Sequence, residues 1–144
     1  MSTQRFCTFE TAGHYFGIAA EAVQEIMPIY HVTRVPRSHP AVRGLMNLRG
    51  RVVTVIDLGA ELGRATPSTS KSAFGIVLER DHDGAVGLQV DAIGDVVEVE
   101  DDLFEPPLDS LGAASALVRG AYRLPDRLLL VLDHARAAQL AETT

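Results

Sequence analysis

The amino-acid sequence predicts a mostly-β domain with Greek-key or barrel closure, built from two copies of one unit. The first observation is an internal repeat, because residues 42–57 match residues 118–133 without a gap at seven of sixteen positions. A second related pair, 17–26 and 87–96, lies upstream of these segments. The other observation is a succession of short strand-like segments separated by tight turns, with little helix, which is typical of closed β-architectures.

Alternating or β-branched segments and turn residues define the elements of the first copy. Its one helical pattern places Ala22, Val23, Ile26 and Met27 on one face, and Pro28 ends it. The expected elements are a hairpin of strands 5–10 and 15–18 across Ala12-Gly13, one or two helical turns over 21–27, a strand over 30–35, and strands over 45–48 and 51–58 joined at Arg49-Gly50.

The second copy repeats this order after a small, polar linker over residues 63–72. The expected elements are a hairpin of strands 74–79 and 85–90, a strand over 93–99, a loop over 105–115 that holds a helical turn, strands over 117–124 and 127–132 joined at Pro125-Asp126, and a C-terminal helix over 134–141.

Length and composition are those of a globular domain. The chain has 144 residues, of which 47% are hydrophobic and 22% charged, enough for one ordinary core or two small ones. Its longest apolar runs are too short to span a membrane, and its N-terminal ten residues lack the apolar stretch of an export signal. We therefore expect a cytoplasmic protein in which the single Cys7 is a buried thiol without a disulfide partner.

The sequence offers no set of residues for catalysis or for a cofactor. The five histidines are scattered without metal-ligand spacing, and neither a nucleophile elbow nor a nucleotide-binding loop occurs. The Asp81–Gly84 segment has the composition of a hairpin turn rather than of a cation site. We expect neither enzymatic activity, nor a metal, nor a cofactor.

Charge is distributed unevenly between the halves of the chain. Residues 1–72 hold eight Lys/Arg and five Asp/Glu, whereas residues 73–144 hold five and fourteen. Nucleic-acid binding would need a basic stripe with stacking aromatics, and a chain with 6% aromatic residues and an acidic half lacks it. Two interpretations of the asymmetry stay open: two solvated faces, or two different protein partners.

The two copies differ most in one turn. Where the first copy has Asn47-Leu48-Arg49-Gly50, the second has Arg123-Leu124-Pro125-Asp126. Positions shared by both copies are mostly apolar and indicate requirements of the fold, whereas polar residues confined to one copy indicate specialisation. The first copy is therefore the expected functional one.

Several stretches resemble the CheW family of chemotaxis coupling proteins over roughly residues 5–140. In the first copy they are the Thr-Phe-Glu, Gly-His-Tyr-Phe-Gly-Ile and Val-Gln-Glu-Ile motifs within 6–26, HVTRVP at 31–36 and VRGLMNLRGRVVTVIDL at 42–58. In the second copy they are GLQVDAIGDVVEV at 87–99, EPPL at 105–108 and GAYRLPDRLLLVLD at 120–133.

The resemblance implies a single CheW-like domain of two interlocked SH3-like five-stranded β-barrels. The expected first unit spans roughly residues 11–62 and the second roughly 73–140. Sharing of the N-terminal strand between the two units is an open alternative. The implied function is a non-enzymatic adaptor that couples chemoreceptor cytoplasmic tips to the regulatory domain of a CheA-type histidine kinase. The implied location is the cytoplasm, at membrane-bound receptor arrays and without membrane insertion.

The family motifs also imply which residues bind receptor or kinase, in part through a groove between the barrels that takes receptor helices. These residues are Val23, Glu25, Ile26, Gly44, Asn47, Arg49, Gly50, Ile93 and Val96.

Structural interpretations compete for some of these positions. Gly44 recurs as Gly120, which favours a backbone requirement, and Asp57 and Asp133 are expected to cap helices. Val23 and Ile26 are alternatively core residues. Arg49 belongs to one copy only, and a functional interpretation is favoured for it.

Two functions remain open at this point. One is the coupling adaptor of a chemoreceptor–kinase array. The other is a CheW-like module that regulates a histidine kinase for surface motility, development or another output without an array.

Overall fold

The structure, a computed structural model, describes residues 2–63, 73–78, 84–106 and 109–143. Its strands are β1 (Thr3–Thr11), β2 (His14–Ala19), β3 (Val23–Pro28), β4 (Val42–Leu48), β5 (Arg51–Asp57), β6 (Phe74–Leu78), β7 (Ala85–Val90), β8 (Ala92–Glu100), β9 (Phe104–Glu105), β10 (Val118–Arg123) and β11 (Leu128–Leu132). Its helical segments are η1 (Ala20–Ala22), α1 (Leu58–Glu61), η2 (Asp101–Leu103), η3 (Asp109–Leu117), α2 (His134–Ala137) and η4 (Ala138–Thr143).

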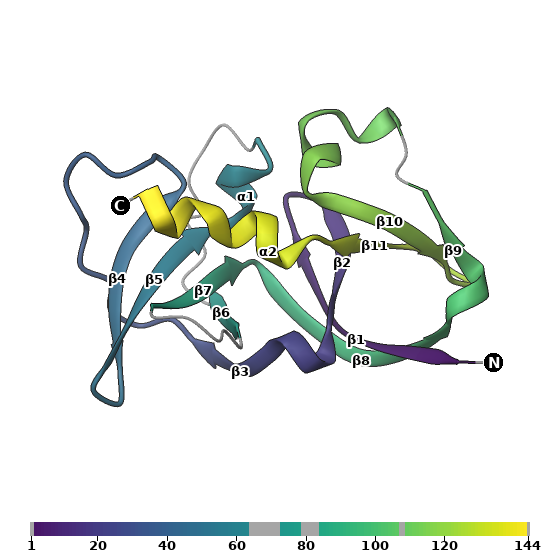
Figure 1. Ribbon diagram of the computed structural model, residues 1–144, viewed down its shortest axis with the longest axis horizontal. Helices are drawn as coiled ribbons and strands as arrows, with labels where there is room; N and C mark the ends of the chain where they lie inside the picture. The colour runs from purple at the N-terminus through teal and green to yellow at the C-terminus, as the bar shows by residue number, and fades with distance from the viewer. Residues whose placement is uncertain (1, 64–72, 79–83, 107–108, 144) are drawn as a thin grey trace.

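These strands form two sheets that lie next to each other along the long axis of the molecule (Figure 1). The five-stranded sheet, in the order β3-β6-β7-β5-β4, is the first barrel. The six-stranded sheet, in the order β8-β1-β2-β11-β10-β9, is the second barrel. This architecture confirms the predicted fold class, two SH3-like barrels with few short helices. The extra strand of the second barrel is β9, which has only two residues.

Each barrel takes strands from both copies of the sequence repeat. The first hairpin of the chain, β1–β2, belongs to the second barrel, and the hairpin β6–β7 belongs to the first barrel. The pairings repeat accordingly: β1 with β8 and β6 with β3 are antiparallel, while β2 with β11 and β7 with β5 are parallel. The chain crosses between the barrels after β2 and again after β7, so the barrels are interlocked.

The buried apolar side chains form a cluster in each barrel and another between the barrels. One cluster, with Met46, Val53 and Val55, fills the first barrel, and a second, with Tyr122 and Leu129, fills the other. Between them, a larger cluster draws buried side chains from both copies. The two barrels therefore share one central core and are not independent domains.

The expected helix over residues 21–27 is wrong. Only η1 is helical, and Val23–Pro28 forms the strand β3, which pairs with β6. The backbone of β3 finds its hydrogen-bond partners in the other copy, a long-range pairing that local periodicity does not reveal. Pro28 fits this strand because β3 lies at an edge of its sheet.

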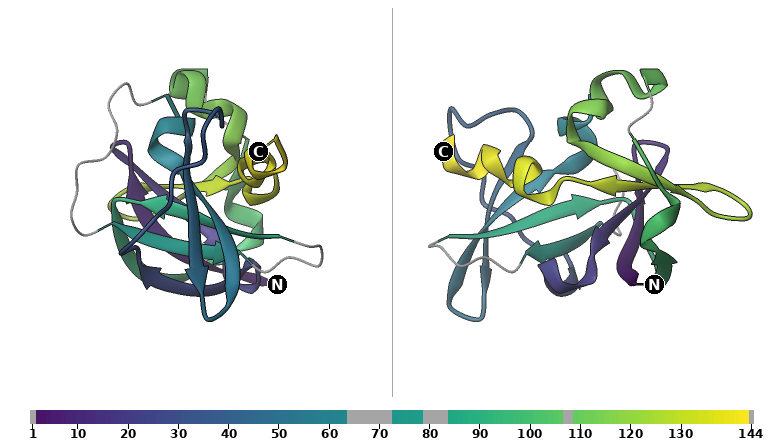
Figure 2. Two further views of the ribbon diagram at one scale, coloured as in Figure 1. Left: turned by 90° about the vertical axis from the view of Figure 1, so that its left-hand side faces the viewer. Right: turned by 45° about the vertical axis from the view of Figure 1, so that its right-hand side comes forward.

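Two further expectations hold only in part. In the segment 30–35 only Thr33 forms a bridge, to Leu45. The C-terminal segment begins as α2 but continues as the 3-10 helix η4, which contacts β5 and β7 of the first barrel (Figures 1 and 2). The expected linker beyond Gly63 and the turn at 81–83 lie outside the described residues.

Candidate functional site

The turn between β4 and β5 presents Arg49 at the end of a hairpin. Arg49 and Gly50 both have positive φ, 51° and 83°, which is the backbone of a two-residue type I′ turn. The Asn47 side chain stabilises the turn, since its Oδ1 accepts a hydrogen bond from the Gly50 N–H at 2.9 Å. The Asn-Leu-Arg-Gly sequence thus builds a rigid turn that holds an arginine in a left-handed conformation.

Arg49 forms an ion pair with Glu25 on β3. The guanidinium is 69% exposed, whereas Glu25 is 26% exposed. Next to this pair, Arg51 Nη1 donates to Gln24 Oε1 at 3.2 Å. Because β3 and β4 are the two edges of the five-stranded sheet, these contacts join the edges and help to close the first barrel.

Glu25 follows an irregularity in its strand. The pairing of β3 with β6 shifts register between Val23 and Glu25, which is the pattern of a β-bulge. Bulges redirect the side chains that follow them, and here the side chain that follows reaches Arg49. The structure therefore brings together Glu25, Asn47, Arg49 and Gly50 of the predicted site.

The four apolar residues expected to line a groove occupy equivalent places on β3 and β8. Val23 and Ile93 are partly buried and pack against the central cluster. Ile26 and Val96 are more exposed, at 38% and 53%. Both strands run along the lower side of the molecule in Figure 1. Val23 is thus partly core and partly surface.

Gly44 and Gly120 have packing roles in both barrels. A Cβ atom on Gly44 would lie 2.1 Å from the Thr33 carbonyl oxygen, and one on Gly120 would lie 2.4 Å from the Glu105 carbonyl oxygen. Both glycines occur at register shifts of their hairpins. Close approach of a neighbouring backbone accounts for Gly44 without any contact to a partner.

Asp57 and Asp133 stand at the ends of equivalent strands. Asp57 Oδ1 accepts from the Ala60 N–H at 3.3 Å, and Asp133 Oδ1 accepts from the Arg136 N–H at 3.1 Å. Each carboxylate therefore caps the short helix that follows it.

Within the described parts of the chain, no group of three or more His, Cys, Asp or Glu side chains is placed to hold a metal ion. Cys7 is half-buried, and burial raises the pKa of its thiol, which favours the unreactive protonated form. None of the described helices is both long and apolar enough to cross a membrane.

Sequence reasoning missed the contact between Arg51 and Gln24. The recurrence of Arg51 as Arg127 in the second copy was the available signal that this arginine has a role in the structure. Arg127 has different contacts: its guanidinium lies 3.9 Å from the centre of the Tyr15 ring and reaches Glu10 at 3.4 Å. The same residue type thus performs different tasks in the two barrels.

Known proteins resemble this chain over most of its length. The CheW-like domain family matches residues 5–142. The chain is 30% identical over 131 residues to the chemotaxis protein CheW of Klebsiella aerogenes, covering 90% of this chain and 78% of that protein. It is also 28% identical over 130 residues to the protein PilI of Pseudomonas aeruginosa, covering 90% of this chain and 72% of that one.

A solved structure has the same fold. The crystal structure of the scaffolding protein TtCheW from Thermoanaerobacter tengcongensis superimposes with a TM-score of 0.81 at 26% sequence identity. The alignment covers 91% of this chain and 89% of that one. With a family match that extends over nearly all its residues, the chain belongs to the CheW-like domain family.

Proposed function

We propose that the protein is a non-enzymatic adaptor that couples the cytoplasmic tips of chemoreceptors to a CheA-type histidine kinase at membrane-bound receptor arrays. Its membership of the CheW-like family and its similarity to a scaffolding protein support this proposal. The observation that carries it is the exposed Arg49 guanidinium, held in place by Glu25 on the same strand as Val23 and Ile26. An oriented cation next to apolar surface suits a protein-binding site.

In this proposal, the receptor tip docks as helices on the apolar residues of β3 and β8. A helix in a groove is held by a few apolar anchors at helical spacing, and Val23, Ile26, Ile93 and Val96 supply partly exposed aliphatic side chains. The histidine kinase binds elsewhere on the same adaptor, through its regulatory domain. The protein then holds receptor and kinase together without a chemical step of its own.

The similarity to PilI supports a second candidate, since that relative is not named as a chemotaxis protein. In this alternative the chain regulates a histidine kinase for surface motility, development or another output without a chemoreceptor array. Genes for a receptor and a kinase beside the gene for this chain would favour the first proposal. A neighbouring kinase gene without a receptor gene would favour the alternative.

Val23→Asp tests the receptor site directly. We expect loss of binding to a soluble receptor-tip fragment, because a charged group would replace an apolar anchor; a central anchor is worth ~2 kcal/mol or more. The measurement is a titration calorimetry series, with thermal unfolding to check the fold. Leu103→Asp is the matched control, since Leu103 is 53% exposed on η2 of the second barrel. Unfolding of the Val23 variant would instead assign Val23 to the core.

A further inference from the structure

Each barrel carries a carboxylate at the same position of the sequence repeat. Glu25 on β3 of the first barrel is equivalent to Asp95 on β8 of the second. A register shift accompanies each carboxylate: in the pairing of β3 with β6 it lies between Val23 and Glu25, and in the pairing of β1 with β8 it lies between Ile93 and Val96, a stretch that includes Asp95. Each is also followed by an exposed aliphatic residue, Ile26 or Val96.

In the first barrel the chain itself provides the cation for this carboxylate. Arg49 pairs with Glu25, and Arg51 adds a hydrogen bond to the neighbouring Gln24 at 3.2 Å. Both arginines come from the β4–β5 hairpin. The carboxylate position of the first barrel is thus satisfied internally.

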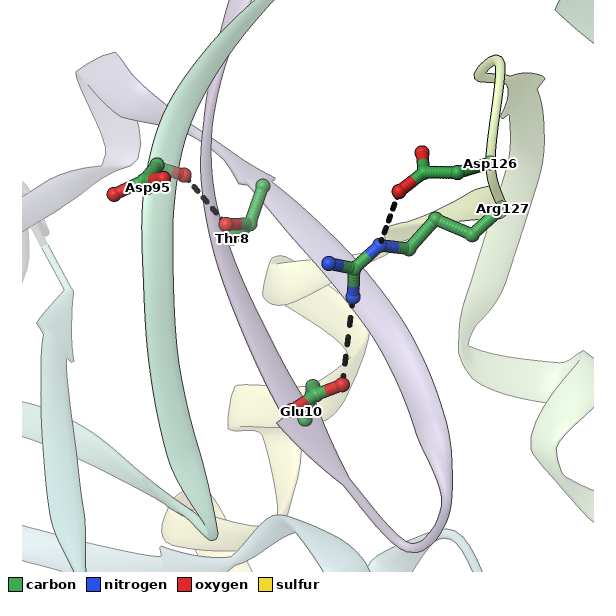
Figure 3. Close-up of polar contacts among 5 residues, drawn as sticks. All are labelled: Thr8, Glu10, Asp95, Asp126 and Arg127. Atoms are coloured by element: carbon green, nitrogen blue, oxygen red, sulfur yellow. Dashed lines mark hydrogen bonds and ion pairs between the residues drawn. The ribbon is translucent and has the colours of Figure 1, made fainter.

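In the second barrel the equivalent hairpin provides no cation for Asp95. Pro125 is at the position equivalent to Arg49, and Arg127 is at the position equivalent to Arg51. Figure 3 shows Arg127 turned toward Glu10, 3.4 Å away, and Asp126, 3.9 Å away. The Asp95 carboxylate forms no hydrogen bond or ion pair with any residue that the structure describes.

The backbone holds Asp95 firmly even so. The hydroxyl of Thr8, which is 1% exposed, donates a hydrogen bond to the Asp95 carbonyl oxygen (Figure 3). Gly94 permits this contact, because a Cβ there would lie 2.5 Å from Thr8 Oγ1. The carboxylate lies on the side of β8 away from Thr8, where the residue is exposed. The backbone that carries this exposed carboxylate is therefore held in place before a partner binds.

We propose that Asp95 receives an arginine side chain of the partner that docks between β3 and β8. The first barrel already contains such a pair, because Glu25 at the equivalent position binds the Arg49 guanidinium. A carboxylate can accept two parallel N–H bonds from a guanidinium, which fixes the partner's orientation as well as its affinity. Val96 packs beside the aliphatic part of the incoming side chain. This inference rests on the proposed receptor-binding function and assigns a specificity residue within it.

The test is Asp95→Asn, which keeps the shape of the side chain and removes its charge. We expect about twofold to fivefold weaker binding of a soluble receptor-tip fragment at low salt, which is the effect of losing one solvent-exposed charge pair. The salt dependence of binding should decrease with it. Asp126→Asn is the matched control, since it removes one exposed negative charge from the same barrel and should leave affinity unchanged.

A second variant tests whether an arginine supplied by the chain itself competes with the partner for Asp95. Pro125→Arg places an arginine at the position where the first copy has Arg49. It should weaken receptor binding in the wild-type background and have no further effect in the Asp95→Asn background. An equal loss in both backgrounds would overturn the proposal, because the arginine would then act without Asp95.

The outcomes separate this inference from the proposed function. Binding that is lost in Val23→Asp but unchanged in Asp95→Asn would refute the Asp95 contact and keep the receptor site. Equal weakening by Asp95→Asn and Asp126→Asn would also refute it, because general charge attraction would explain both. A folded wild-type protein that binds no receptor fragment would refute the proposed function itself.

Discussion

Arg49 contributes little to the stability of the fold, so its charge remains available for the proposed binding role. Its pair with Glu25 is largely solvent-exposed on the arginine side, and exposed pairs add only about 0.2–1 kcal/mol to stability. The structural value of the pair lies in fixing the direction of the guanidinium. Charge at this position should therefore affect binding far more than folding.

Arg49→Glu should fold normally and lose receptor-dependent control of the kinase, and Arg49→Lys should restore that control only in part because a lysine lacks the guanidinium fork. A double-mutant cycle of Glu25→Ala and Arg49→Ala, read on both unfolding free energy and receptor affinity, measures whether the two side chains act together. Additive effects in both measurements would reassign Arg49 to direct contact with a partner's carboxylate.

Glu61 gives a prediction about pH. Burial raises the pKa of its carboxyl from 4.5 to about 8, and its Oε1 is buried without a hydrogen-bond partner among the described residues. The folded state therefore holds a proton that the unfolded state releases, so the stability present below pH 4.5 is lost as the pH rises to about 8. Glu61→Gln should remove this loss.

Chemical denaturation of the wild type and Glu61→Gln at several pH values measures this difference. The variant should gain stability relative to the wild type between pH 4.5 and 8, with no further gain above that range. Glu98→Gln, at an exposed residue of β8, is the control for replacing a surface carboxyl by an amide. A pH-independent difference for Glu61→Gln would show that the carboxyl is ionised normally.

At the scale of elements, the two β-hairpins that end each copy share one construction. Each contains a register shift at a glycine that another backbone segment approaches closely, and each ends in an aspartate that caps the next short helix. The repeat in the sequence is therefore a repeat of packing constraints. These constraints predict which glycines cannot be replaced.

Gly44→Ala and Gly120→Ala should each destabilise the protein by about 3 kcal/mol or more, because the new Cβ would overlap a backbone oxygen that cannot easily move. Gly84→Ala is the control for backbone strain alone. Its φ is 93°, but no atom lies within 4 Å of the added Cβ, so it should cost only about 1 kcal/mol. Denaturant unfolding of the three variants compares the costs, and equal values would contradict the steric explanation.

On the scale of the whole molecule, the exchange of hairpins makes each barrel depend on both copies. β1 and β2 complete the second barrel, while β6 and β7 complete the first, and the central cluster draws on all four. Neither copy alone contains the strands of a complete barrel. The protein should therefore unfold in one cooperative transition, although it has two barrels.

Tryptophan reporters can test this, since the chain has no tryptophan of its own. Val52→Trp places a probe at an exposed site of the first barrel and Leu103→Trp places one in the second. Their fluorescence transitions in denaturant should coincide within error. Fragments 11–62 and 73–140 should remain unfolded in isolation, and a folded fragment or two separate transitions would refute the interdependence.

Four features follow from the amino-acid sequence alone: the repeat, the mostly-β character, the turn at Arg49-Gly50 and the restriction of Arg49 to one copy. These features are local or arise from comparing the copies, so they can be read without knowing which strands pair. The structure then places the Arg49 and Glu25 side chains in contact.

Which strands share a sheet depends on long-range pairing, which the sequence pattern does not show. The pairing of β3 with β6 makes the expected helix a strand. The exchange of hairpins brings Arg127 to Glu10 and leaves the Asp95 carboxylate without a partner among the described residues. Such contacts join residues distant along the chain, and their hydrogen bonds and packing outweigh the weak helical preference of a six-residue segment. The local sequence pattern therefore specified most of the strands and turns, and long-range pairing specified how the strands assemble into sheets.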